Sequence, residues 1–205
     1  MYIFRIILYL FFSFLNCKKN KLIISLTSNK NTIKNVEKVI NSIIKQNVDY
    51  SLYEIILILS KKDFNYNNEI PSKLISLKDS KKLRIILINQ KLTSQSRLII
   101  AIKKYPNNPI LIISENIILP YGWLEMFIND HKKYPNSAIS ASLQYYFGKN
   151  LEIKEFVEGY KGEKYGIFNQ VVDMVFNFAI INTDLGGTLY PSNFFNNNIF
   201  NYYDF

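Results

Sequence analysis

The stretch ILIISENIILPYGW, residues 110–123, is the most informative part of this sequence. It begins with an unbroken apolar run, residues 110–113, which is typical of a strand covered on both faces. A polar triplet, residues 114–116, follows the run directly. Apolar residues then recur at helical spacing from Trp123 until Pro135. The stretch therefore predicts a central buried strand, a polar strand end and a following helix.

The residues before this strand alternate short apolar runs with amphipathic stretches, which is the pattern of βαβ units. Three further strands are predicted, at residues 22–26, 55–59 and 84–88. Three helices are predicted after them, at residues 33–44, 70–77 and 98–105. The first and third helices have candidate caps, namely Asn31 or Thr32, and Ser94 or Ser96. The predicted fold class is α/β, with a mainly parallel sheet flanked by helices.

The residues after Pro135 give a less decisive pattern. A strand is predicted at about residues 138–143, followed by a less regular region at 145–169. Residues 171–181 are apolar enough for the core, but their periodicity fits either a helix or a strand. The last thirteen residues contain five Asn and six aromatic residues, which indicates a frayed or incomplete end. We expect a single domain over residues 21–205, incomplete at its C-terminus.

Residues 1–20 are expected to form a hydrophobic leader or anchor ahead of this domain. The apolar block is shorter than the roughly 20 residues that a bilayer span requires. Three interpretations are open: a signal peptide, an interfacial anchor, or a leader before the first core strand. The lysines that follow favour the cytoplasmic face, so we expect a cytoplasmic protein that contacts the membrane through residues 1–16. Export as a lipoprotein, with cleavage before Cys17, is the alternative.

The formal charge of +9 does not by itself indicate a nucleic-acid partner. Of the 25 basic residues, 22 are Lys, and they are scattered in runs no longer than two. Arg, whose planar fork reads phosphate and guanine, occurs only three times. Since no basic patch is clustered in the sequence, we expect no binding to nucleic acid.

Cys17 is the only cysteine and His131 the only histidine. A single cysteine excludes an intrachain disulfide and a cysteine-based zinc site. His131 lies near the end of a predicted helix beside two lysines, where we expect solvated surface. We therefore expect no catalytic triad.

Polar residues follow each predicted parallel strand. In open α/β sheets, ligands bind outside the carboxyl ends of the strands, so these positions are candidates for a binding site. They are Thr27 and Ser28, Ser60 and Lys61, residues 91–97, and residues 114–116. Each position taken alone favours an ordinary polar turn over a binding site.

Five segments, taken in order, resemble a known family. They are SLTS (25–28), ILS (58–60), LIIAIKKYP (98–106), IILPYGWLE (117–125) and GGTLYP (186–191). Together they resemble a bacterial branch of the family 2 glycosyltransferases with the GT-A fold. The resemblance covers about residues 21–200, and its last two segments are the more specific ones.

The resemblance implies transfer of a sugar from a nucleotide-diphosphate donor to a glycan or surface-polysaccharide acceptor. It also implies Mg²⁺ or Mn²⁺, because a diphosphate leaving group gains negative charge that a divalent cation can neutralise. The nucleotide-sugar site would include the first two strand ends, at Thr27, Ser28 and Ser60.

The family has an Asp-Asp-Asp triplet directly before its Ile-Ile-x-Pro sequence, and this chain has Ser114, Glu115 and Asn116. Hard divalent cations prefer anionic oxygen ligands, whereas the two outer positions here offer a hydroxyl and an amide. Asn116 and Glu115 are therefore weak candidates for metal ligands, and we expect weak metal binding at best.

Three more positions gain a role from the resemblance. Arg97 stands where the family has a Lys or Arg at the start of a helix, so it would contact the diphosphate. An exposed helix cation is the alternative. Gly186 and Gly187 match a glycine pair that would let the backbone approach the donor sugar or acceptor, and a plain tight turn is the alternative. Trp123 is predicted to serve packing.

The family's catalytic base lies in an acidic pair shortly before a Trp, well after the glycine pair. After Gly187 the only acidic residue here is Asp204, and no Trp follows. Three hypotheses result: a glycosyltransferase-like protein with altered catalytic residues, a non-catalytic nucleotide- or partner-binding module, or a remnant of an interrupted glycosyltransferase gene.

Overall fold

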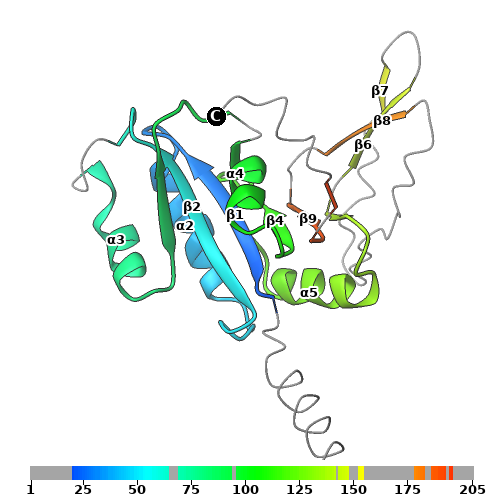
Figure 1. Cartoon of the computed structure of the whole chain (residues 1–205), viewed down its shortest axis with the longest axis horizontal. Coiled ribbons are helices and arrows are strands. Elements are labelled where there is room, and N and C mark those ends of the chain that lie inside the picture. Colours follow the sequence, from blue (N-terminus) through cyan, green and yellow to red (C-terminus); the bar gives the residue numbers. More distant parts are fainter. Residues whose placement is uncertain are drawn as a thin grey trace, which may run out of the picture.

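The computed structural model describes residues 20–64, 69–93, 96–141, 143–147, 152–154, 178–182, 186–192 and 194–195. Its main sheet has six strands in the order β3-β2-β1-β4-β9-β5. Figure 1 labels β2, β1, β4 and β9 of this sheet. Four strands are parallel: β1 (Leu22–Ser28), β2 (Tyr53–Ser60), β3 (Arg84–Ile88) and β4 (Ile110–Ile112). Strand β9 (Thr188–Tyr190) is antiparallel to β4 and to β5 (Ile139–Ser140). The predicted mainly parallel α/β sheet is confirmed.

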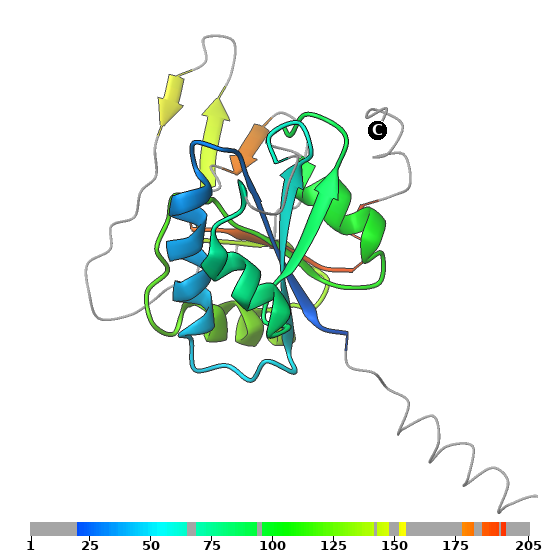
Figure 2. The same cartoon turned by 90° about the vertical axis from the view of Figure 1, so that its left-hand side faces the viewer.

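Helices cover both faces of this sheet, as Figure 2 shows. One face carries α2 (Ile33–Ile44), α3 (Ser72–Asp79) and α5 (Trp123–Lys133). The other face carries α4 (Ser96–Lys104). All four helices were predicted from apolar spacing, and their bounds differ from the predictions by a few residues at most.

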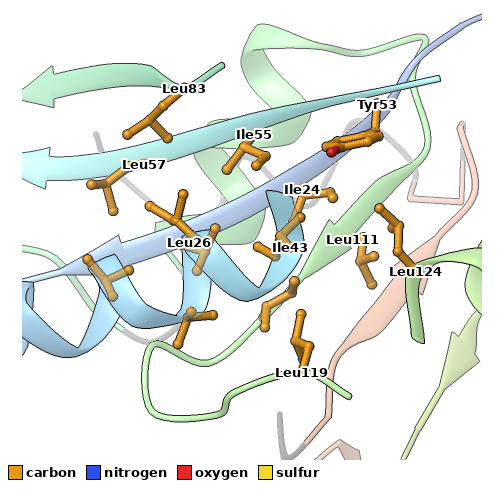
Figure 3. Packing of buried hydrophobic residues seen from close by; sticks show 14 of the residues in the cluster. Ile24, Leu26, Ile43, Tyr53, Ile55, Leu57, Leu83, Leu111, Leu119 and Leu124 are labelled. Carbon is orange, nitrogen blue, oxygen red and sulfur yellow. The ribbon is translucent and has the colours of Figure 1, made fainter. Parts of the chain in front are cut away.

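Strand β1 shows why the sheet needs helices on both sides. Every residue of β1 is buried, and successive side chains of a strand point to opposite faces. Ile24 and Leu26 join the core beneath α2, where they lie beside Ile43 (Figure 3). Ile23 joins the second core, beneath α4, together with Ile100. Since a fully buried Leu or Ile side chain contributes roughly 1.5–3 kcal/mol, the two cores together hold the strand ends in place.

Two polar side chains, Ser42 in α2 and Gln46 just after its C-terminal end, fix the loop that follows β4. Ser42 Oγ accepts a hydrogen bond from the backbone N–H of Leu119 at 3.1 Å. Gln46 Nε2 donates to the carbonyl oxygen of Pro120 at 2.9 Å, and Gln46 Oε1 accepts from the N–H of Leu124 at 3.4 Å. Both side chains are buried, so these bonds satisfy backbone groups that water does not reach.

A second, three-stranded antiparallel sheet contains β7 (Glu152–Lys154), β6 (Leu143–Phe147) and β8 (Phe178–Asn182), in that order. The prediction of a less regular region over 145–169 is therefore wrong for 145–147 and 152–154. The strand predicted at 138–143 is in fact divided between β5 and β6. Strand β6 pairs with β8, and β5 pairs with β9; both partners lie far along the chain, so local periodicity does not reveal them. Of the segment 171–181, which was left open between helix and strand, the described residues 178–181 belong to strand β8.

Several predictions lie outside the described residues. They concern the leader and Cys17 within residues 1–19, the segments 155–177 and 183–185, and the C-terminal end from residue 196. Within the described ranges, no helix has both the length and the apolar character that a membrane crossing requires.

His131 departs from the prediction of solvated surface. It lies in the last turn of α5 and is half-buried. Its Nδ1 is shielded from solvent and has no hydrogen-bond partner among the described residues. Burial lowers the pKa of His131 below its ordinary value, because the charged form is poorly solvated there.

Candidate functional site

The four parallel strands end at one edge of the sheet, and a polar cleft of about 720 Å³ lies there. Each strand contributes residues at its end or directly after it. The lining residues are Thr27, Ser28, Asn29, Lys30, Asn31, Ser60, Lys62, Asp63, Lys91, Leu92, Thr93, Arg97, Ser114 and Glu115. The cleft thus occupies the edge at which open α/β sheets bind their ligands.

The structure brings together most of the site residues predicted from the sequence. Those that line the cleft are Thr27, Ser28, Ser60, Arg97, Ser114 and Glu115. Asn116, Gly186 and Gly187 are not among the lining residues. Contact of any of these residues with a nucleotide sugar stays a prediction.

The sequence interpretation overlooked the charged residues that come one to three positions later. Lys30 follows the end of β1, and Lys62 and Asp63 follow the end of β2. Lys61, which was singled out instead of Lys62, does not line the cleft, and its backbone N–H donates to the carbonyl of Ile88 at 2.7 Å. The only signal available in the sequence was position after a strand end.

The loop from β1 to α2 is held by two polar side chains. Asn29 Oδ1 accepts hydrogen bonds from the backbone N–H groups of Asn31 (2.8 Å) and Thr32 (3.1 Å). Thr32 Oγ1 accepts from the N–H of Asn29 at 3.2 Å and lies 2.9 Å from Ser28 Oγ. Thr32, one of the two predicted caps, is the N-cap residue of α2, although its side chain bonds the loop and not the helix. The loop therefore presents Lys30 and Asn31 to the cleft in a fixed backbone conformation.

Ser60 joins the loops after β2 and β3. Its hydroxyl donates to the carbonyl oxygen of Gln90 at 2.7 Å and accepts from the backbone N–H of Lys62 at 3.2 Å. Ser60 is buried, so this bond is well protected from water. As a result, Lys62 and Lys91 enter the cleft from two loops that are bonded to each other.

Arg97 is the most deeply placed cation of the cleft, with 5% of the residue exposed. It lies in the first turn of α4, and the hydroxyl of Ser25 in β1 donates to its carbonyl oxygen at 2.7 Å. Its Nη1 donates to the carbonyl oxygen of Ile113 at 3.2 Å and lies 4.0 Å from Glu115 Oε2. The alternative interpretation of Arg97 as an exposed helix cation is wrong, because α4 packs this residue against the ends of β1 and β4.

The triplet after β4 provides few ligands for a metal ion. Glu115 carries its one carboxylate, and that group lies beside the Arg97 guanidinium. The amide oxygen of Asn116 accepts from Asn35 Nδ2 at 3.4 Å, and Ser114 Oγ accepts from the N–H of Asn116, also at 3.4 Å. Across the described part of the chain, no group of three or more His, Cys, Asp or Glu side chains is placed to hold a metal. This donor set fits Mg²⁺ or Mn²⁺ poorly, since both ions prefer anionic oxygen ligands.

The glycine pair serves packing in this structure. Gly186 and Gly187 have φ values of +97° and +96°, which residues with a side chain rarely adopt. A Cβ on Gly187 would lie 2.8 Å from the Trp123 ring. Trp123 is buried, and its Nε1 donates to the carbonyl oxygen of Gly186 at 2.9 Å. The predicted packing role of Trp123 is confirmed, and the pair allows the backbone to pass close to that ring.

Positive charge predominates around the cleft. Its basic lining residues are Lys30, Lys62, Lys91 and Arg97, and its acidic ones are Asp63 and Glu115. Helices α2 and α4 also begin at this edge, where their backbone dipoles favour an anion. Chemically, the arrangement is suited to binding a multiply charged anion through charge-assisted hydrogen bonds.

The sequence matches no protein-family model and no curated protein. Among solved structures, the chain is similar to mannosyltransferase PcManGT from Pyrobaculum calidifontis in complex with GDP-Man and Mn²⁺: 12% identity, 60% of this chain, 36% of that one, TM-score 0.49. It is also similar to S. aureus TarS: 11% identity, 58% of this chain, 34% of that one, TM-score 0.48. A third is 4-diphosphocytidyl-2C-methyl-D-erythritol synthase from Anaerococcus prevotii: 11% identity, 84% of this chain, 70% of that one, TM-score 0.47. The chain spans about a third of the length of the first two. All three TM-scores lie below 0.5, and the cleft itself is the basis for the function proposed next.

Proposed function

We propose that the cleft binds the diphosphate and adjoining nucleoside of a nucleotide sugar, and that the protein is a glycosyltransferase-like protein. The supporting observation is the excess of cations around a polar cleft at the carboxyl edge of a parallel sheet. Arg97 and the lysines of the cleft would contact the diphosphate. The resemblance of five sequence segments, in order, to family 2 glycosyltransferases supports the same proposal.

The acceptor in this proposal is a glycan or surface polysaccharide. Transfer requires a group that deprotonates the acceptor hydroxyl, and Asp63 and Glu115 are the carboxylates that line the cleft. Glu115 lies beside Arg97, with 4.0 Å between its Oε2 and Nη1 of the guanidinium.

A nucleotide-binding module without transfer activity is the second candidate. The observation that favours it is the triplet after β4, which has a single carboxylate. A module of this kind would bind the donor or a partner and leave the sugar in place. The two candidates share the ligand and differ in turnover.

The proposed location is the cytoplasmic face of a membrane, with contact through residues 1–16. The full chain should then sediment with vesicles, whereas a chain that begins at residue 20 should remain in the supernatant. Equal partition of the two chains would refute the membrane contact. It would leave the binding proposal intact, because the cleft lies within residues 27–115.

Thermal unfolding in the presence of nucleotide sugars tests the binding proposal. A ligand at 100 times its Kd stabilises the folded state by about 2.7 kcal/mol. For a chain of this size, that corresponds to a rise in Tm of roughly 5–11 °C. A panel of UDP-, GDP-, CDP- and dTDP-sugars should contain at least one that produces such a rise. The absence of any shift across the panel refutes both candidates.

A matched pair of lysine variants locates the binding site. Lys91→Gln removes a cation that lines the cleft, and Lys104→Gln removes an exposed cation at the far end of α4. We expect Lys91→Gln to weaken nucleotide-sugar binding about threefold to tenfold, and Lys104→Gln to leave it unchanged. Equal effects of the two substitutions on affinity would show that the nucleotide sugar does not bind in this cleft.

Turnover separates the enzyme from the binding module. Release of nucleoside diphosphate from the bound donor, measured with and without a mixture of polysaccharide acceptors, is expected for a transferase. Tight donor binding without release under either condition supports the module.

A further inference from the structure

We propose that the cleft binds its diphosphate ligand without a divalent cation, because its own lysines and Arg97 supply the neutralising positive charge. This inference rests on the proposed function and concerns how the same cleft recognises the anion. It is carried by two features of the cleft, namely the surroundings of Glu115 and the arrangement of the basic residues.

Glu115 is poorly placed to hold a metal ion. Its Oε2 lies 4.0 Å from Nη1 of Arg97, and only 6% of the Arg97 side chain is exposed. Nη1 is also bonded to the carbonyl oxygen of Ile113, so the guanidinium is anchored at this position. A divalent cation on the Glu115 carboxylate would lie close to a buried positive charge, and the two would repel each other.

The neighbours of Glu115 do not compensate for this repulsion. Ser114 contributes a neutral hydroxyl, and the amide oxygen of Asn116 lies within hydrogen-bond distance of Asn35. The second carboxylate of the cleft belongs to Asp63, which follows β2 and not β4. Within the described residues, no group of three or more Asp, Glu, His or Cys side chains is placed to hold a metal ion.

The basic residues are placed to take over the role of a cation. Lys62 and Lys91 enter from the loops after β2 and β3, which the hydrogen bond from Ser60 to Gln90 joins. Neither lysine forms an ion pair with another described residue. Lys30 enters from the loop after β1 and bonds Glu69 at 3.2 Å. That pair is partly exposed, and exposed pairs exchange partners at little cost. Cations thus surround the cleft from three loops, with Arg97 at its base.

The two ways of neutralising a diphosphate predict opposite results for Glu115→Gln. If Glu115 holds a metal, its loss weakens metal-supported binding. If Arg97 contacts the phosphates directly, loss of the neighbouring negative charge strengthens binding, because Glu115 no longer competes for the guanidinium. Glu125→Gln, at an exposed position in the first turn of α5, is the matched control.

The experiment is titration calorimetry of the full chain with UDP, GDP and inorganic pyrophosphate, in EDTA and in saturating Mg²⁺ or Mn²⁺. We expect at least one nucleoside diphosphate to bind in EDTA with an affinity within about twofold of that in metal. Glu115→Gln should strengthen metal-free binding about twofold to tenfold, and Glu125→Gln should leave it unchanged. Affinity should fall as salt is raised, since the contacts are between charges.

The contrary outcomes are distinct. Binding that requires metal and is weakened by Glu115→Gln overturns metal independence and leaves the proposed function standing. No binding of any probe in any buffer overturns both. Binding of pyrophosphate as tight as that of the nucleoside diphosphates keeps metal independence and contradicts nucleoside recognition. Circular dichroism of both variants confirms that the substitutions left the fold intact.

Discussion

The two ends of the parallel strands use similar polar residues in different ways. At the amino ends, Glu54 of β2 accepts from Arg84 Nε at 2.8 Å and from the Tyr105 hydroxyl at 2.9 Å. The Arg84 guanidinium also lies 5.8 Å from the centre of the Tyr105 ring. At the carboxyl ends, Lys62 and Lys91 surround an open cleft of about 720 Å³.

This difference separates stabilising polar groups from binding ones. The polar side chains at the amino edge form hydrogen bonds and ion pairs with one another, so their replacement should change the free energy of unfolding. Groups at the carboxyl edge surround an open volume, so their replacement should change ligand affinity. Each of the following variants tests this division.

The largest effect is expected for Gly187→Ala, beside the carboxyl edge. Its Cβ would lie 2.8 Å from the Trp123 ring and 3.2 Å from the Ile112 carbonyl oxygen, at a φ of +96°. Strain and overpacking together should lower the free energy of unfolding by about 3 kcal/mol. Chemical denaturation measures this change. Gly122→Ala is the control, because its φ is also positive but, apart from its neighbours in the chain, no atom of the described residues lies within 4 Å of the added Cβ. This substitution should cost only about 1 kcal/mol.

Gly187→Ala also tests whether the glycine pair contacts the ligand. If the glycine pair serves packing alone, ligand affinity per folded molecule stays unchanged while stability falls. A large loss of affinity with little loss of stability would instead place the pair in contact with the ligand.

The next effect is expected for Glu54→Gln at the amino edge. The change weakens two charge-assisted hydrogen bonds, and Arg84 is largely exposed, so the free energy of unfolding should fall by about 1 kcal/mol. Nucleotide-sugar affinity should be unaffected, because Glu54 lies at the opposite edge from the cleft. A loss of stability accompanied by an equal loss of affinity would contradict the assignment of Glu54 to a purely stabilising role.

A pH titration tests the same cluster. Burial, followed by the bond to Glu54, raises the pKa of Tyr105 to about 12. The folded protein therefore holds this proton more tightly than the unfolded chain, whose tyrosines titrate near pH 10. The stabilisation is complete below about pH 10 and is lost as the pH rises to about 12. Because the group is partly exposed, we expect a loss of about 1 kcal/mol, as the difference between the wild-type and Tyr105→Phe melting curves. Identical curves across this pH range would contradict the assignment.

The smallest effect on stability is expected for Lys62→Gln and Lys91→Gln. Both lysines are exposed, so the free energy of unfolding should change by less than about 0.5 kcal/mol. Affinity for nucleotide sugar should nevertheless fall severalfold, and its dependence on salt should become shallower. A stability loss as large as that of Glu54→Gln would show that these lysines are structural after all.

Much of the fold could be predicted from local patterns, because burial on both faces leaves a direct trace in the sequence. The run at 110–113 and the apolar spacing of 33–44 predicted β4 and α2 almost to the residue. Strand β9 was missed, since its short, glycine-preceded segment becomes a strand only by pairing with β4. The small sheet was missed for the same reason, as β6 pairs with β8 across a long separation.

The layered α/β class and the position of polar residues at the ends of the strands could be read from the sequence, because both follow from side-chain periodicity. What those residues do depends on the tertiary structure. It buried Arg97 against Ile113 and Glu115, bonded the loops that carry Lys62 and Lys91, and used Gly187 to admit the ring of Trp123. Those roles depend on distances between segments far apart in the chain, and such distances are set only when the helices pack onto the sheet.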